Sequence, residues 1–86
     1  MVDIRKIRFF VAVYEAGSIT RAAEREHIAQ PALTVHIQQI EDELKVKLFE
    51  RSAQGVNPTP AGRHFYGICQ DLLRRLEKYR QSKVPS

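Results

Sequence analysis

Three polar side chains recur at intervals of four residues in the middle of the chain: Gln30, Thr34 and Gln38. This spacing places them on one face of a helix. Amide and hydroxyl groups donate and accept hydrogen bonds, and glutamine can pair bidentately with adenine in the major groove of DNA. Pro31, Val35 and the methyl group of Thr34 could contact a thymine methyl. Together the five residues predict a surface that reads base edges.

The charges around these residues favour one orientation of that helix. Residues 29–40 contain no Lys, Arg, Asp or Glu, whereas Glu41, Asp42 and Glu43 follow directly. Acid at a helix C-terminus opposes the helix dipole, a cost that is tolerable if that end points away from a polyanion. The positive N-terminal end, with Gln30 leading, would then face phosphates. The alternative is an ordinary amphipathic helix with a neutral outer face, and the pattern alone leaves both open.

The other reactive side chains form no catalytic or metal-binding pattern. His27, His36 and His64 have no spacing typical of a ligand pair, and one cysteine cannot complete a zinc site. We therefore expect no metal, no cofactor and no enzymatic activity, and we expect the histidines in surface or capping roles. His36 is the exception, since its charge below about pH 6.5 could add a phosphate contact. Cys69 falls on an apolar helix face and is expected to pack.

Composition restricts the class of protein. The 86 residues, 43% of them hydrophobic, allow one domain with a single core. The formal charge is +4, but the last 16 residues hold five basic and two acidic side chains and thus most of the excess. Bulk charge therefore does not by itself indicate nucleic-acid binding. A single cysteine, with no apolar stretch of signal-peptide or membrane-spanning length, predicts a cytoplasmic protein.

Capping residues and turn residues predict the elements that position the polar surface. Asp3, Ser18 and Thr59 stand where a helix can begin, and Gly17 stands where one can end. A proline near the start of the third and fourth helices suits a first turn, where the missing N–H costs nothing. The expected elements are helices over residues 4–16, 19–26, 30 to about 44 and 60 to about 81, with two short strands around a turn within residues 48–58.

Apolar spacing predicts which helix faces are buried. The small residues Ala22 and Ala23 would let another helix approach the second helix closely. The second and third helices, joined by a tight connection, are typical of a helix-turn-helix. The expected inner faces are Ile7, Phe10, Val11 and Tyr14 on the first helix and Leu33, Ile37, Ile40 and Leu44 on the third.

The last helix carries an apolar seam. Phe65, Cys69, Leu72, Leu76 and Tyr79 recur at four, three, four and three, as in two helices packed side by side. The alternative is that this face covers the domain's own core, and we expect both. Phe65 and Ile68 should seal the core, whereas Leu72, Leu73, Leu76 and Tyr79 should form the interface of a symmetric homodimer.

Several spaced motifs, in the correct order, carry a family resemblance. They are AV at 12–13, EAGSITRAA at 15–23, IAQPALT at 28–34, IEDEL at 40–44, LFER at 48–51 and TPAG at 59–62. Together they resemble the N-terminal DNA-binding domain of LysR-type transcriptional regulators. The resemblance covers nearly the whole chain.

The resemblance implies a winged helix-turn-helix, mainly α, with a three-helix core, a small β-hairpin wing and a long C-terminal linker helix. Residues 1–58 would form the DNA-binding domain and residues 59–86 the linker and dimerisation helix. The domain would bind double-stranded DNA specifically, as a dimer on two half-sites. A small-molecule effector would act only through a larger domain that these residues lack. Base contacts would come from Gln30, Pro31, Thr34, Val35 and Gln38, and backbone contacts from Ser18, Thr20, Arg51, Gln54 and Asn57.

The sequence departs from the usual family pattern in four places. Ala29 replaces a common capping serine, so the helix start should lose about 1 kcal/mol unless Gln30 or a phosphate substitutes for the hydroxyl. Val35 stands where arginine is common, which predicts weaker discrimination of guanine and more contact with thymine. Lys45 replaces a common glycine. Gln54 replaces a frequent basic residue in the wing, which predicts a shallower dependence of affinity on salt.

Two other functions remain as alternatives. The first is a protein-interaction module, a small helical dimer in which the neutral face of the third helix binds another protein. The second is a nonspecific nucleoid or RNA binder. The second is disfavoured because the groove-facing helix lacks basic residues and no aromatic stacking platform is evident.

Overall fold

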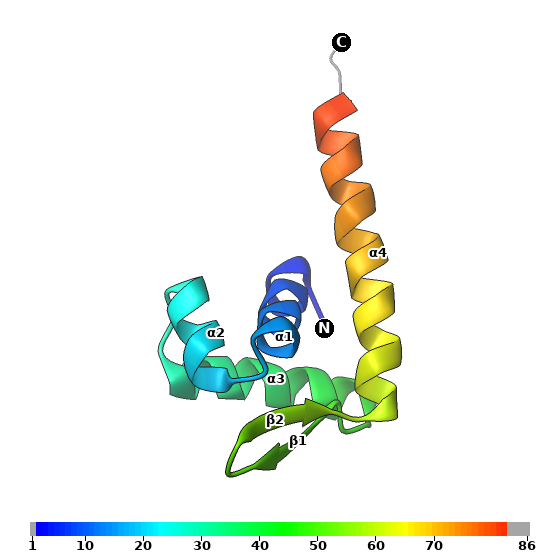
Figure 1. Ribbon diagram of the computed structural model, residues 1–86. Coiled ribbons are helices and arrows are strands. Elements are labelled where there is room, and N and C mark those ends of the chain that lie inside the picture. Colours follow the sequence, from blue (N-terminus) through cyan, green and yellow to red (C-terminus); the bar gives the residue numbers. More distant parts are fainter. Residues whose placement is uncertain (1, 83–86) are drawn as a thin grey trace.

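The computed structural model describes residues 2–82, which form four helices and one two-stranded antiparallel hairpin (Figure 1). The bounds are Ile4–Ala16 for α1, Ile19–Glu26 for α2, Gln30–Leu44 for α3, Phe49–Ser52 for β1, Gly55–Pro58 for β2 and Pro60–Ser82 for α4. The mainly helical fold with a hairpin before the last helix is thus confirmed. The end of the predicted linker segment, residues 83–86, lies outside the described residues.

The predicted helix ends are confirmed at the level of single hydrogen bonds. The carboxylate of Asp3 accepts the N–H of Lys6 at 2.9 Å, and this bond is the main cause that lowers the pKa of Asp3. Ser18 Oγ accepts the N–H of Arg21 at 3.1 Å. Gly17 ends α1 with φ of 65°, in the left-handed region that glycine adopts without strain.

α1 lies at the centre of the domain, in contact with α2, α3 and α4. Every residue from Phe9 to Val13 is buried. The sequence predicted a single buried face for this helix, whereas the structure buries residues on several faces. A helix packed on several sides buries most of its circumference. Leu44 was expected on the inner face of α3 but is 41% exposed, because it stands on the last turn of α3, beyond the buried Ile40.

The hairpin is attached to the helical core by close backbone approaches. Strand β1 pairs with β2 in the register Arg51 to Val56, and the Val56 N–H donates to the carbonyl of Gly17 at 3.3 Å. A Cβ atom on Gly55 would lie 2.6 Å from that same carbonyl oxygen, and φ at Gly55 is 134°. A Cβ atom on Gly62 in α4 would collide with the carbonyl oxygen of Leu48. Glycine is therefore required at both positions.

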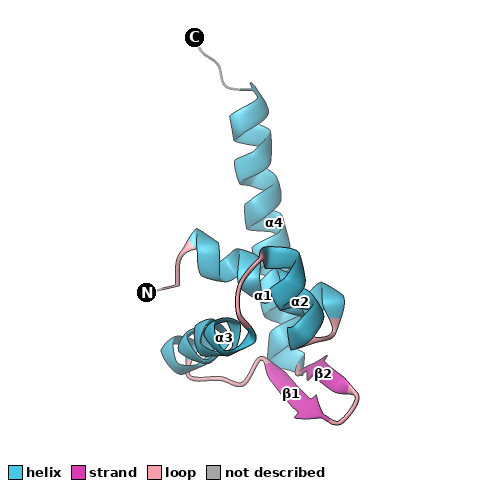
Figure 2. Cartoon of the chain, turned by 90° about the vertical axis from the view of Figure 1, so that its left-hand side faces the viewer, coloured by secondary structure: helices cyan, strands magenta, loops and turns pink. Residues whose placement is uncertain are grey.

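α4 begins against the core and then extends away from it (Figure 1; Figure 2). Thr59 caps it, accepting the N–H of Gly62 at 2.9 Å. Cys69 is buried, as predicted, and burial raises the pKa of its thiol to about 11. The expectation for Ile68 was wrong, since it is 52% exposed. Neighbouring residues of a helix point about 100° apart, so the turn that buries Cys69 directs Ile68 elsewhere.

Candidate nucleic-acid interface

The first turn of α3 lacks a side-chain cap, as the sequence predicted. Ala29 provides no side-chain acceptor, and Pro31 occupies the first turn of the helix. The first-turn N–H groups of a helix have no partner within the helix itself. They carry the positive end of the helix dipole, so this end of α3 suits an anionic acceptor from outside.

Four of the five predicted base-reading side chains are exposed on α3. Gln30, Pro31, Val35 and Gln38 are open to solvent, and Thr34 is half-buried. The opposite side of α3 is held by the buried residues Leu33, Ile37 and Ile40. The tertiary structure therefore leaves the uncharged face of α3 accessible, with the core on the far side.

α2 supports α3 through a tight turn. His27 takes the left-handed conformation with φ of 57°, and the N–H of Ile28 donates to the carbonyl of Ala23 at 3.0 Å. Of the predicted backbone-contact residues nearby, Thr20 is exposed, whereas Ser18 is half-buried. The oxygen of Ser18 accepts the capping bond, and its O–H is still able to donate to a phosphate oxygen.

The hairpin lies beside α3 at the end of the molecule remote from the free end of α4 (Figure 1; Figure 2). Arg51, Gln54 and Asn57, the predicted wing residues, are all exposed. A groove separates α3 from the hairpin, and Gln38 lines it together with Arg51. Helix and hairpin thus present polar side chains to one hollow in the surface.

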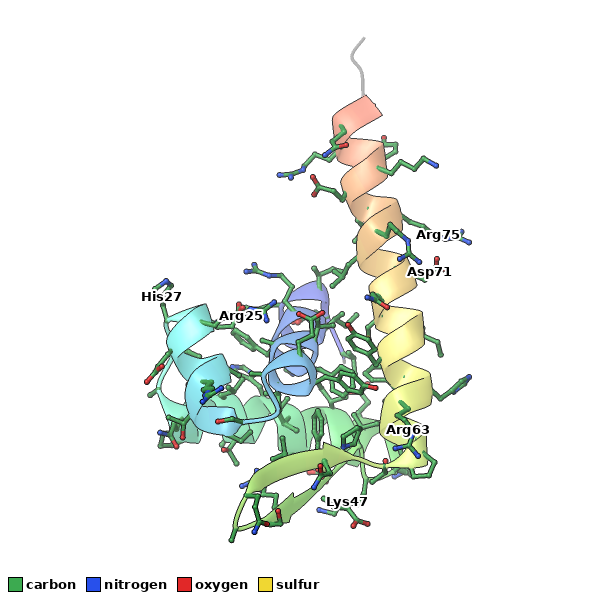
Figure 3. The ribbon with its side chains drawn as sticks, in the orientation of Figure 1. Arg25, His27, Lys47, Arg63, Asp71 and Arg75 are labelled. Atoms are coloured by element: carbon green, nitrogen blue, oxygen red, sulfur yellow. The ribbon has the colours of Figure 1, made fainter. Side chains whose placement is uncertain are left out.

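Sequence reasoning missed two residues that line this groove. Lys47 lies beside the hairpin with a side chain that is 79% exposed (Figure 3). Glu41 was expected to point outward with Asp42 and Glu43, but its side chain is only 11% exposed. The Lys47 Nζ atom lies 3.9 Å from Glu41 Oε1. A basic residue directly before the LFER motif was the available signal for Lys47, whereas no local pattern indicated the burial of Glu41.

The family follows from a comparison of the sequence with known protein families. Residues 4–63 match the model of the bacterial regulatory helix-turn-helix proteins of the lysR family. The chain belongs to the LysR family. The predicted resemblance is thereby confirmed, and the fold described above is the winged helix-turn-helix of a LysR DNA-binding domain. The family comprises transcription regulators rather than enzymes.

Relatives and solved structures agree with this assignment. The LysR chain is 46% identical over 77 residues to the regulator TfdT of Cupriavidus pinatubonensis, covering 90% of the chain and 34% of TfdT. It is 42% identical over 77 residues to BenM of Acinetobacter baylyi, covering 90% of the chain and 25% of BenM. The BenM DNA-binding domain in complex with benA site 1 DNA superposes with a TM-score of 0.89 at 40% identity, covering 93% of both chains.

A second complex leads to the same conclusion. The DNA-binding domain of CbnR, solved with DNA, matches the LysR chain with a TM-score of 0.88 at 35% identity, over 93% of this chain and 92% of that one. The chain spans about a quarter to a third of the length of the curated relatives it matches. It is the DNA-binding domain of a LysR-type transcriptional regulator.

The histidines of this LysR domain do not form a metal-binding cluster within the described residues. The His36 ring packs against Phe9 of α1, with ring centroids 5.0 Å apart, and its Nδ1 atom is buried without a hydrogen-bond partner in the described residues. His36 therefore faces α1, and this placement does not support the phosphate contact expected of it. Within residues 2–82, histidine, cysteine and acidic side chains form no group that could hold a metal ion.

The predicted dimerisation residues lie on the projecting half of α4. Leu72, Leu76 and Tyr79 are exposed, Tyr79 by 76%. Leu73 instead packs partly against the core of the LysR domain, so only three of the four remain as an open stripe. Among the residues that the structure describes, no helix combines the length and apolar character needed to cross a membrane.

Proposed function

We propose that this domain binds double-stranded DNA sequence-specifically, with α3 in the major groove and the hairpin on the flanking backbone. The observation that carries the proposal is the exposed, uncharged face of α3, whose opposite side is buried. Charged side chains bind phosphates regardless of sequence, whereas amide and apolar groups discriminate base edges. The related DNA-binding domains of BenM and CbnR, both solved in complex with DNA, give further support.

The residues of the interface take two roles in this proposal. Glutamine amides on α3 pair with adenine, and Val35 packs against a thymine methyl where arginine would have read guanine. The backbone contacts position the domain without reading sequence. Base-reading residues are Gln30, Pro31, Thr34, Val35 and Gln38, and backbone contacts come from Ser18, Thr20, Arg51, Gln54 and Asn57.

We also propose a symmetric homodimer in which α4 packs against α4 of a second copy. Leu72 and Leu76 are exposed on a helix that has already left the core, and burying them requires a partner. A two-fold dimer would present its two α3 helices to successive major grooves, about 34 Å apart. In this division residues 1–58 read DNA and residues 59–86 dimerise. We place the regulator in the bacterial cytoplasm, with any effector bound by the part of its relatives that this chain does not span.

Enrichment of binding sites from a random pool of DNA duplexes tests the proposal. The expected product is a two-fold symmetric site rich in A and T at the contacted positions. Competition gel shifts should then favour this site over random duplex by about a thousandfold or more. Failure to enrich any sequence, with only weak and salt-labile binding, would instead indicate a module that binds another protein.

A further inference from the structure

One carboxylate at the acidic end of α3 is turned into the domain. The Glu41 side chain is 11% exposed, whereas Asp42 and Glu43 on the same turn are exposed. Glu41 Oε2 accepts the N–H of Leu48 at 2.8 Å and the N–H of Phe49 at 3.3 Å. A single oxygen of α3 therefore binds two backbone groups at the start of the hairpin.

These bonds connect two parts of the DNA-binding surface. Residues 45–48 link α3 to β1, and Lys45 turns the chain there with φ of 57°. The Glu41 carboxylate spans this connection and closes it, because hydrogen bonds to a charged acceptor are about twice as strong as neutral ones. Without Glu41, the N–H groups of the buried residues Leu48 and Phe49 would lose their acceptor.

The location of Glu41 is unfavourable for DNA binding by charge alone. The residue lines the groove between α3 and the hairpin, together with Gln38 and Arg51. A negative charge there repels the phosphates that the wing would approach, and the Lys47 ammonium, 3.9 Å from Glu41 Oε1, offsets only part of that repulsion because it is largely exposed to solvent. The presence of Glu41 is explained if holding the hairpin in place gains more DNA-binding free energy than the negative charge loses by repelling phosphates.

We propose that Glu41 is a positioning residue that holds the wing against the reading helix. It determines where Arg51 and Gln54 meet the DNA backbone, and it does so through the two hydrogen bonds that Oε2 accepts rather than through any contact of its own with DNA. The inference rests on the proposed function, because it assigns Glu41 to the wing half of that interface and leaves the base contacts of α3 unchanged.

Three variants test the role of Glu41. Glu41→Ala removes the acceptor and the charge, Glu41→Gln keeps an acceptor oxygen without the charge, and Asp42→Ala removes a charge from the same turn as a matched control. Glu41→Ala should bind specific and random duplexes alike about three- to tenfold more weakly, with a salt slope lower by roughly one per lost phosphate contact. It should lose hydroxyl-radical protection of the DNA backbone at the wing while keeping its base preferences.

The rescue and the control make the result decisive. Glu41→Gln should retain most of the affinity and the wing protection, and Asp42→Ala should lose neither. Equal effects of Glu41→Ala and Asp42→Ala, a Glu41→Gln variant as weak as Glu41→Ala, or altered base preferences in Glu41→Ala would each overturn the assignment. If the unmodified protein shows no sequence preference at all, the proposed function fails, which is a different outcome.

A measurement on the unmodified protein covers the case in which Glu41→Ala does not fold. The N–H groups of Leu48 and Phe49 should exchange with deuterium as slowly as those inside helices, because the carboxylate holds them. Rapid exchange at both positions, while the hairpin N–H of Val56 stays protected, would show that Glu41 does not hold the wing.

Discussion

Gln30 and Gln38 stand about 12 Å apart along the axis of α3, eight residues at 1.5 Å each. Both are exposed, so each amide can reach its own base pair without competing for the other's partner. Val35 lies between them, 48% exposed, and offers only apolar contact. At the scale of single residues, the proposed function therefore assigns sequence reading to amides and methyl groups, because no arginine lies on α3.

Replacing Gln30 with alanine should cost about 1–3 kcal/mol of binding free energy at a single base pair. Affinity for random duplex should stay nearly intact, because the backbone contacts remain. Gel-shift titrations against a set of single-base variants of the enriched site would measure both. Gln39→Ala is the matched control, since Gln39 is exposed on α3 beside Lys6 of α1. A uniform loss across all duplexes would mean that Gln30 only contacts the backbone.

His36 is the residue whose replacement should stabilise the protein. Its Nδ1 atom is buried without a partner in the described residues, and a buried unsatisfied polar group costs about 1–3 kcal/mol. We expect His36→Leu to raise the free energy of unfolding by about 1 kcal/mol and the melting temperature by roughly 4–8 °C, measured by thermal denaturation. His64→Leu, at an exposed position of α4, should change little. A lower melting temperature for His36→Leu would contradict this reading.

At the scale of elements, one carboxylate joins three helices through two hydrogen bonds. The hydroxyl of Tyr66 in α4 donates to the Glu15 carboxylate of α1 at 2.7 Å, and Arg25 of α2 donates to the same carboxylate at 3.0 Å. The Tyr66 ring stacks on Tyr14 with centroids 3.8 Å apart and planes 3° from parallel. The base of α4 is therefore oriented by α1 and α2 together.

The Tyr66 contact predicts a pH dependence of stability. The bond to Glu15 raises the pKa of Tyr66 to about 12 in the folded state, against about 10 in the unfolded chain. The bond's contribution is thus complete below pH 10 and lost as the pH rises towards 12. Tyr66→Phe should lower stability by up to about 1 kcal/mol at pH 8, and the difference from the unmodified protein should shrink above pH 10.

Urea denaturation at pH 8 and at pH 11.5 would test this dependence. His64→Leu, at an exposed position of α4, serves as the control and should behave as the unmodified protein at both values. A constant difference between Tyr66→Phe and the unmodified protein across this range would contradict the raised pKa of Tyr66 in the folded state.

At the scale of the whole molecule, the shape agrees with the proposed dimer surface on α4. The longest dimension is 50 Å against 26 and 21 Å, because α4 continues past the core (Figure 1). Its outer half carries the exposed residues Leu72, Leu76 and Tyr79, while ion pairs such as Arg75 with Asp71 at 3.1 Å occupy another side (Figure 3). The helix thus has an apolar stripe and a charged side, as expected of a helix that pairs with another.

Replacing Leu72 and Leu76 together with aspartate should convert the dimer to a monomer, because buried carboxylates in the seam would be strongly unfavourable. Sedimentation velocity across a range of concentrations would measure the change. Arg74→Asp, at an exposed position on the same part of α4, should leave the dimer intact. An unmodified protein that sediments as a monomer at high concentration would refute the dimer.

Much of this protein follows from the sequence because it depends on neighbouring residues. The caps at Asp3, Ser18 and Thr59 each accept an N–H group three positions away, so a short window contains both partners. The same holds for the charge-free stretch at residues 29–40, which is visible without a structure. Helix bounds, the hairpin and the candidate reading face could therefore all be predicted.

The remainder was decided by contacts between distant segments. Glu41 turns inward because the chain returns beside it at Leu48, and the His36 ring packs against Phe9 because α1 lies against α3. The burial of α1 on several sides and the exposure of Ile68 both depend on where α4 lies. Each of these features depends on the relative positions of whole elements, which no local spacing specifies. Only the tertiary structure therefore revealed the hydrogen bonds that join α3 to the start of the hairpin.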